Sequence, residues 1–95
     1  MGIKYSSDAF ATLTALINYI ESKNTAGAGL RWFHRYEIFL QNEFVNLKRK
    51  RLCENATFKK LNLRCLYFND WLIAFSINEH DILIEAILHK SRVKD

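Results

Sequence analysis

The second half of the chain holds five side chains that could act together on a phosphodiester: Lys59, Lys60, Arg64, His89 and Arg92. RNA cleavage needs a base that activates the ribose 2′-hydroxyl, cations that hold the phosphate, and an acid for the leaving oxygen. In this interpretation Lys60 and Arg64 hold the phosphate and His89 serves as acid or base. In the structural interpretation Arg64 pairs with a carboxylate, His89 forms a hydrogen bond at a strand end, and the lysines are solvated. The sequence leaves both open, so we assign no catalytic residue.

Other kinds of chemistry have weaker patterns. Zinc sites need about four clustered ligands, whereas the histidines lie far apart, at His34, His80 and His89. Gly27 and Gly29 are not followed by the Lys-Ser/Thr of a phosphate-binding loop. We therefore expect neither a metal nor a cofactor.

Cys53 and Cys65 are the two cysteines of the chain. They are too few and too widely spaced for a disulfide framework or a Cys-x-x-Cys centre. We expect both to be reduced, with Cys65 as a small core residue within a strand. A nucleophilic pair of Cys65 and His89 is conceivable, but the sequence indicates no oxyanion donor or third partner for it.

The composition is that of one small folded domain spanning residues 1–95. Hydrophobic residues make up 49% and charged residues 25%, which argues against global disorder. No apolar run approaches the ~20 residues of a membrane span, and the N-terminus lacks a signal-peptide pattern. We therefore expect a cytoplasmic protein without membrane contact.

Positive charge gathers in residues 48–64, which hold half of the fourteen lysines and arginines and a single acid, Glu54. The cations are Lys48, Arg49, Lys50, Arg51, Lys59, Lys60 and Arg64. Such a segment favours RNA, DNA or an acidic peptide as a partner. It is equally compatible with a helix that ends in cations, which the helix dipole favours.

The first half of the chain predicts a short strand and two helices. Residues 2–5 form the strand, and Ser6 or Ser7 caps a helix over residues 8–23. Its apolar residues share one face at helical spacing: Ala9, Phe10, Leu13, Leu16, Ile17 and Ile20. Residues 24–29 then turn the chain.

A second helix is predicted over residues 30–51. Apolar residues cover much more of its circumference than they cover of the first helix. The core stripe comprises Phe33, Tyr36, Leu40, Phe44 and Leu47, with Trp32 and Phe39 on one shoulder and Ile38 and Val45 on the other flank. Either all of these are buried, or the surplus around Trp32 and Phe39 is a docking surface for another chain.

Three strands follow a loop at residues 54–57. Asn69-Asp70 fits a two-residue hairpin turn, which pairs Phe68 with Trp71 and Arg64 with Phe75. A second turn at residues 78–81 pairs Phe75 with Ile84. The helices should then cover Leu66, Phe68, Trp71, Ile73, Phe75, Ile77, Ile82, Ile84, Ala86 and Leu88. The opposite face holds Leu63, Cys65, Tyr67, Leu72, Ala74, Ser76, Leu83, Glu85, Ile87 and His89. A slip of one residue would exchange the faces.

Several short motifs, in this order, resemble the RelE/ParE superfamily of toxins from bacterial type II toxin–antitoxin systems. They are Ser7-Asp8-Ala9-Phe10 after the first strand, Arg64 seven residues before Trp71, Leu72-Ile73 with Phe75, and Ala86-Ile87-Leu88-His89 followed by Arg92. The resemblance covers nearly the whole chain. It implies an α+β fold in which a short N-terminal strand precedes a helical hairpin packed on an antiparallel sheet, in the order β-α-α-β-β-β.

The branch of the superfamily decides the mechanism. RelE-like members are ribosome-dependent mRNA endonucleases, often with a tyrosine near the C-terminus, and this chain has none after Tyr67. ParE-like members inhibit DNA gyrase, and the Leu-His ending is similar to theirs. The resemblance thus favours growth inhibition and plasmid stabilisation by a gyrase-binding toxin that is not an enzyme. The alternatives are a RelE-like endoribonuclease acting on ribosome and mRNA, with Lys60, Arg64, His89 and Arg92 as its site, and a non-toxic interaction module.

Either toxin branch implies a cognate antitoxin, whose tail lays a helix on the helical hairpin and a strand along the sheet edge. Toxin and antitoxin could then form a hetero-oligomer. We predict that antitoxin contacts Trp32, Tyr36, Phe39, Lys48, Arg49 and Arg51. For the target we predict contacts with the open sheet face and with Arg64, His89, Lys90, Arg92 and Lys94.

Overall fold

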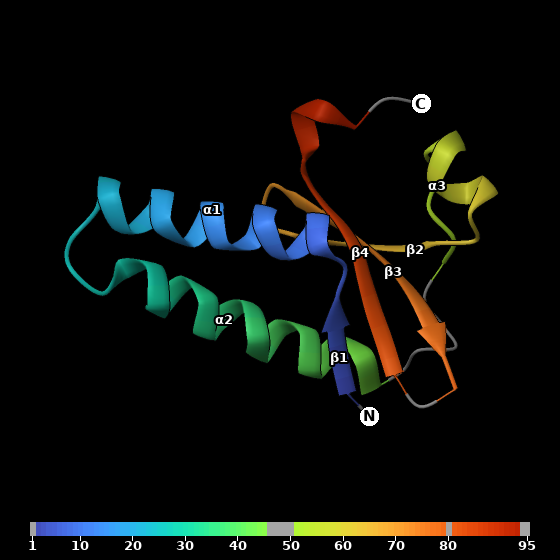
Figure 1. Ribbon diagram of the computed structural model, residues 1–95, viewed down its shortest axis with the longest axis horizontal. Helices are drawn as coiled ribbons and strands as arrows, with labels where there is room; N and C mark the ends of the chain where they lie inside the picture. The colour runs from blue at the N-terminus through green and yellow to red at the C-terminus, as the bar shows by residue number, and fades with distance from the viewer. Residues whose placement is uncertain (1, 46–50, 80, 94–95) are drawn as a thin grey trace.

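The computed structural model describes residues 2–45, 51–79 and 81–93. A helical hairpin lies against one face of a four-stranded sheet, and a third, short helix lies on the other side (Figure 1). The elements are β1 (Gly2–Tyr5), α1 (Ser7–Lys23), α2 (Ala28–Glu43), α3 (Ala56–Lys60), β2 (Arg64–Phe68), β3 (Trp71–Asn78), β4 (Asp81–His89) and the 3-10 turn η2 (Lys90–Arg92). The predicted α+β class is confirmed.

Helix α1 begins where the sequence predicts, because Ser6 caps it. The Ser6 Oγ accepts a hydrogen bond from the Ala9 N–H at 3.0 Å and donates one to the Glu85 carbonyl at 2.9 Å. The cap therefore also ties the helix to β4. Its apolar face buries Ala9, Leu13 and Leu16.

The hairpin turn is closed by a carboxylate. Gly27 lies before α2 with φ of 85° and has no side chain to cap the helix. Glu21 on α1 takes that role: its carboxylate accepts from the Gly27 N–H at 2.7 Å and from the Gly29 N–H at 2.9 Å. These two bonds, with the nearby Arg31, lower the pKa of Glu21. A Cβ on Gly29 would lie 2.6 Å from the Ile17 carbonyl oxygen, so the two helices approach each other closely here.

The sheet has the order β1-β4-β3-β2. The predicted register of the three-strand meander is confirmed, with Phe68 opposite Trp71, Arg64 opposite Phe75, and Phe75 opposite Ile84. Strand β1 adds a parallel pair with β4, so the complete sheet is mixed. A parallel neighbour needs a long crossover, which the helical hairpin provides between β1 and the meander.

A β-bulge at Glu85 changes which residues of β4 face the helices. Ala74 pairs with Ala86, but the next residue, Phe75, pairs with Ile84, which leaves Glu85 without an opposite partner. Before the bulge the predicted face is correct. After it the faces exchange: Ile87 is buried in the main core, and Ala86 packs on the opposite side of the sheet. The prediction that Ala86 and Leu88 face the helices is therefore wrong.

Trp32 and Phe39, the residues of α2 considered as a docking surface, lie mostly in the core. Trp32 is 8% exposed and Tyr36 is 1% exposed, and their rings stack at 5.5 Å. Phe39 is half-buried against Phe68, with ring centroids 5.0 Å apart. The Tyr36 hydroxyl lies 2.9 Å from the Tyr5 hydroxyl in a hydrogen bond between helix and sheet. Burial raises the pKa of both tyrosines.

The region after α2 differs most from the prediction. Helix α2 ends at Glu43, and Arg51 lies outside any helix; Leu47 is outside the described residues. Helix α3 occupies part of the predicted loop, capped by Asn55, whose side chain accepts from the Phe58 N–H at 3.1 Å. Cys53 and Cys65 form a disulfide, so the prediction of two reduced thiols is wrong.

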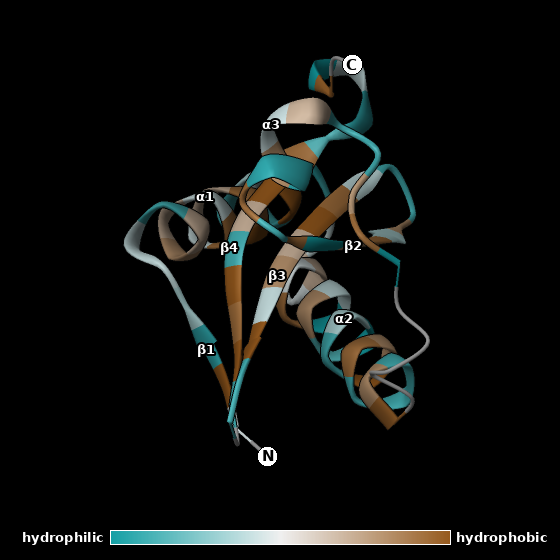
Figure 2. Ribbon diagram, turned by 90° about the vertical axis from the view of Figure 1, so that its right-hand side faces the viewer, coloured by the Kyte–Doolittle hydropathy of each residue, from teal (hydrophilic) through white to brown (hydrophobic). Residues whose placement is uncertain are grey.

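Apolar residues form two separate clusters on the two faces of the sheet. The larger lies between the sheet and the hairpin and includes Ile73 and Phe75 of β3 and Ile82, Ile84 and Ile87 of β4. The ribbons of both strands are largely hydrophobic (Figure 2). The smaller consists of Cys53, Leu63 and Ala74, with Phe58 of α3 packed against it.

Candidate functional site

A groove of about 760 Å³ runs between α1 and the C-terminal end of β4. Its lining includes Tyr19 from α1, Trp71 from β3, and Ile87, His89, Ser91 and Arg92 from the end of the chain. Apolar side chains form most of its surface, and its polar groups come from Thr12 and Tyr19 of α1 and from His89, Ser91 and Arg92. The groove therefore offers an apolar floor with a histidine and an arginine on it.

His89 is held in this groove by two neighbours. Its ring lies edge-on to Trp71, the residue opposite it on β3, with centroids 5.2 Å apart. Its Nδ1 accepts from the Ser91 N–H at 3.2 Å and lies 2.9 Å from the Ser91 Oγ, so the side chain caps η2. With Nδ1 as acceptor, the neutral ring carries its hydrogen on Nε2. The prediction that His89 lies on the open sheet face is wrong, because the Glu85 bulge turns it toward α1.

The turn η2 is anchored to the hairpin between β2 and β3. The Lys90 N–H donates to the Asp70 carbonyl at 2.7 Å, and its ammonium pairs with the Asp70 carboxylate at 3.0 Å. Both side chains are largely exposed, so the ion pair adds little stability by itself. The backbone hydrogen bond from Lys90 to Asp70 fixes the start of η2, and therefore the position of the backbone that carries Arg92. Arg92 is exposed, and Lys94 lies outside the described residues.

Arg64 and His89 lie two strands apart and at different levels of the sheet. His89 is level with Phe68 across β3, and Arg64 is four residues earlier on β2. Four residues span about 13 Å along a strand and two strand spacings about 10 Å, which puts the two Cα atoms about 16 Å apart. Lys60 lies on α3, on the other side of the sheet from α1 (Figure 1). The four predicted nuclease residues are therefore not gathered; His89 and Arg92 share the groove, and Lys60 and Arg64 do not line it.

The residues predicted to contact an antitoxin are also separated. Trp32 and Tyr36 are buried, Phe39 is half-buried, and Arg51 is exposed. Lys48 and Arg49 lie outside the described residues. On the isolated chain, Trp32 and Tyr36 therefore offer little surface to a partner, whereas Phe39 is partly accessible.

The exposed apolar residues of α2 and of the turn after it lie on the side of the helix opposite Trp32 and Tyr36. Leu30 is 70% exposed, Ile38 45%, and Val45, in the turn after the helix, 76%. At about 100° per residue these three fall within an arc of about 80°. We call this set the α2 stripe. Its spacing is visible in the sequence, but the sequence does not reveal which side of an apolar-rich helix meets the sheet.

Metal and membrane features can be assessed only for residues 2–45, 51–79 and 81–93. Among these, no group of three or more His, Cys, Asp or Glu side chains could hold a metal ion. No helix in the described part of the chain is long and apolar enough to cross a membrane.

Comparison with protein families decides the identity of this fold. The model of the ParE toxin of the type II toxin–antitoxin system parDE matches residues 3–94. The chain belongs to the ParE toxin family. A comparison with curated proteins gives no significant match. As a ParE family member the chain is the toxin of a type II toxin–antitoxin pair, and the family implies an antitoxin as its partner.

Proposed function

We propose that this ParE family toxin arrests growth by binding DNA gyrase in the bacterial cytoplasm, and that its cognate antitoxin neutralises it by direct binding. The family match over residues 3–94 carries the proposal. It spans the helical hairpin, the sheet and the C-terminal turn, so it includes the candidate groove as well as the core.

The distribution of the cations favours binding over catalysis. A ribonuclease needs its acid, base and phosphate-holding groups within hydrogen-bond reach of one phosphodiester. The Cα atoms of Arg64 and His89 are about 16 Å apart, and neither Lys60 nor Arg64 lines the groove that holds His89, which favours a binding role for these cations. A binding surface has no such requirement, because charges spread over a face still steer a large partner.

The α1–β4 groove is the proposed contact with the target. An apolar floor beside Trp71 and Ile87, with Arg92 exposed at its edge, fits an apolar side chain of the target next to a carboxylate. Lys90 stands beside the groove and Lys94 follows it in sequence, which would extend the positive charge. Arg64 lies elsewhere and is not part of this contact.

The second candidate function is RelE-like cleavage of mRNA on the ribosome. One observation favours it: His89 and Arg92 share a groove large enough for a nucleotide. The remaining phosphate contacts would then have to come from the ribosome or from groups other than Lys60 and Arg64.

For the antitoxin, the α2 stripe is the proposed docking surface. Leu30, Ile38 and Val45 project from one side of the hairpin and could receive the apolar face of an added helix. Exposed Arg51 would attract acidic residues and would mainly raise the rate of association.

The deciding experiment measures DNA supercoiling by gyrase and, in parallel, translation with primer extension on the message, using the purified toxin and Arg92→Glu. Arg35→Glu on α2 is the matched control, since it removes the same charge from an exposed position outside the groove. We expect the toxin and Arg35→Glu to block supercoiling with the message intact, and Arg92→Glu to lose at least about tenfold in potency.

Cleaved message with intact supercoiling would refute the gyrase proposal and establish the nuclease. Equal potency of Arg92→Glu and Arg35→Glu would remove the groove from the target contact. Normal growth on expression of the toxin alone would favour a non-toxic interaction module.

A further inference from the structure

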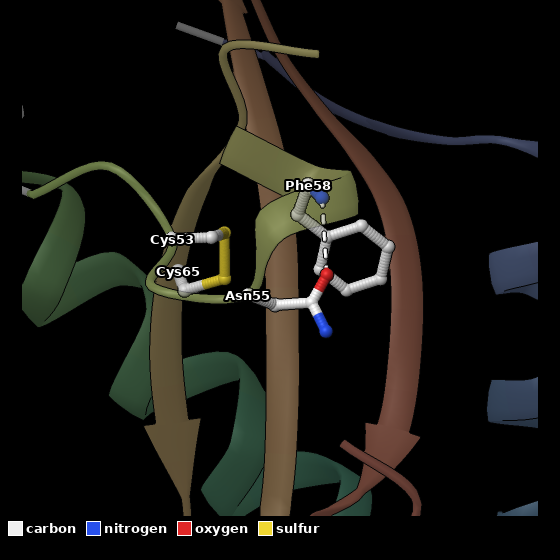
Figure 3. Close-up of a disulfide and its surroundings, with 4 residues drawn as sticks. All are labelled: Cys53, Asn55, Phe58 and Cys65. Atoms are coloured by element: carbon white, nitrogen blue, oxygen red, sulfur yellow. Dashed lines mark hydrogen bonds between the residues drawn. A yellow bond between two sulfur atoms is a disulfide. The ribbon is translucent and has the colours of Figure 1, made fainter. Parts of the chain in front are cut away.

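The disulfide joins a short segment to the outer strand of the sheet. Residues 51–53, which we call the strap, run beside β2, and Cys53 is bonded to Cys65 with Cα atoms 4.9 Å apart (Figure 3). Leu52 forms an isolated antiparallel bridge with Arg64. The strap therefore acts as a small added strand on the edge of β2.

The backbone holds the strap weakly. The Cys53 N–H donates to the Leu63 carbonyl at 2.9 Å, but the second bond, from the Cys65 N–H to the Arg51 carbonyl, is 3.4 Å long. Hydrogen bonds weaken beyond about 3.2 Å. One good backbone bond and one long one leave the disulfide as the strongest connection between strap and sheet.

The disulfide also closes the loop that contains α3. Its two cysteines are 12 residues apart in sequence. Helix α3 has five residues and none of them is buried, so it is too short to be stable by itself. It is held by Phe58, which packs against the small cluster of Cys53, Leu63 and Ala74. Breaking the disulfide would therefore loosen the strap and α3 together.

The main core does not depend on this bond. The thirteen buried residues of the larger cluster include neither cysteine, and they lie on the other face of the sheet. The hairpin, β1, β3 and β4 should keep their positions when the strap is released. This separation makes a local opening feasible without global unfolding.

The two cysteines differ in how accessible they are to solvent. Cys53 is 2% exposed, whereas Cys65 is half-buried. A hollow of about 230 Å³ adjoins both cysteines, and its lining includes one cation, Arg51, and one carboxylate, Glu54.

We propose that the Cys53–Cys65 disulfide is a redox latch that holds the strap over the edge of β2 and releases it on reduction by a dithiol. The thiolate of the dithiol attacks the Cys65 Sγ, and the Cys53 Sγ leaves with the electron pair and takes a proton. The second thiol then resolves the mixed disulfide and releases Cys65 as a thiol. The dithiol is oxidised to a disulfide, and the protein gains two electrons and two protons.

Release of the strap opens an interaction edge. Strand β2 is the outermost strand on its side of the sheet, and the strap covers it at Leu63, Arg64 and Cys65. Without the strap, the Leu63 carbonyl and the Cys65 N–H lose these partners and become available along the outer edge of the sheet.

The test is amide hydrogen exchange on the purified, full-length protein, oxidised and after treatment with dithiothreitol. The Cys53 and Cys65 amides report on the strap; the Ser6 amide, bonded to Ile84, and the Phe10 amide, bonded to Ser6, report on the main fold. We expect exchange at Cys53 and Cys65 to accelerate at least about tenfold on reduction, with Ser6 and Phe10 unchanged.

A double variant, Cys53→Ser with Cys65→Ser, controls for effects of the reductant. It should exchange like the reduced protein, with or without dithiothreitol. Three results would overturn the latch: slow exchange at Cys53 and Cys65 in the reduced protein, slow exchange at these positions in the double variant, or equal acceleration at Ser6 and Phe10.

Discussion

Removing the hydroxyl of Tyr5 and removing the hydroxyl of Tyr36 should lower the stability of the protein by unequal amounts. The oxygens are 2.9 Å apart, but Tyr36 is 1% exposed and Tyr5 is only half-buried. Tyr5→Phe leaves the Tyr36 hydroxyl buried without a partner, which costs ~2 kcal/mol, within the usual range of about 1–3 kcal/mol. Tyr36→Phe leaves a hydroxyl that water can reach, and we expect a loss of ~1 kcal/mol or less.

Urea unfolding of the two single variants and of the double Phe variant measures this directly. Because replacing both partners by apolar groups is nearly neutral, the double variant should be more stable than Tyr5→Phe, with a coupling of at least ~1 kcal/mol. Tyr19→Phe, at a 61% exposed position, is the matched control and should change stability by less than ~0.5 kcal/mol. Equal losses in both single variants, or strict additivity in the double, would refute the reasoning from burial.

Three further predictions concern pH, packing and partner binding. Because burial raises the folded-state pKa of Tyr5 and Tyr36 above the ordinary tyrosine value of 10.0, their stabilising contribution is complete below pH 10 and is lost as pH rises through the folded-state pKa. Alkaline titration of the unfolding free energy should show a decline of up to ~1.4 kcal/mol per pH unit per tyrosine, smaller in Tyr36→Phe. Gly29→Ala should destabilise by ~1–3 kcal/mol in thermal or urea melts, since its Cβ would lie 2.6 Å from a backbone oxygen of α1; an unchanged midpoint would contradict the close helix approach. Leu30→Ser with Ile38→Ser should weaken antitoxin binding at least about tenfold in calorimetry, while Phe10→Ser on α1 should not; equal affinities would exclude the α2 stripe.

The register of the meander could be predicted because it depends on local information. A two-residue turn at Asn69-Asp70 fixes the partner of Phe68, and the alternation of strand side chains then places every residue up to Ile84. The bulge at Glu85 follows from no local pattern, and a single extra residue reverses the faces beyond it. The sequence therefore places His89 on the wrong face of the sheet. Its hydrogen bond at the end of β4 agrees with the structural interpretation of this residue.

The second helix shows the limit of periodicity. Its apolar residues cover so much of the circumference that several stripes are possible, and the tertiary partner selects among them. The side of α2 that carries Trp32 and Tyr36 packs on the sheet, because the Phe68 ring contacts both of their rings. The disulfide was missed for a related reason: a pairing 12 residues apart becomes possible only when the strap returns to β2.

The parallel pairing of β1 with β4 has a consequence for how the protein is made. Gly2 lies opposite Asp81, so the first strand must wait for the last one before it can take its place in the sheet. During synthesis, Ile3 and Tyr5 remain without their strand partners until Ile82 and Ile84 have been translated. Such contacts between distant parts of a sequence slow folding. The α1–α2 hairpin can form before β4 has been translated, so the toxin reaches its active shape only after β4 has joined the sheet.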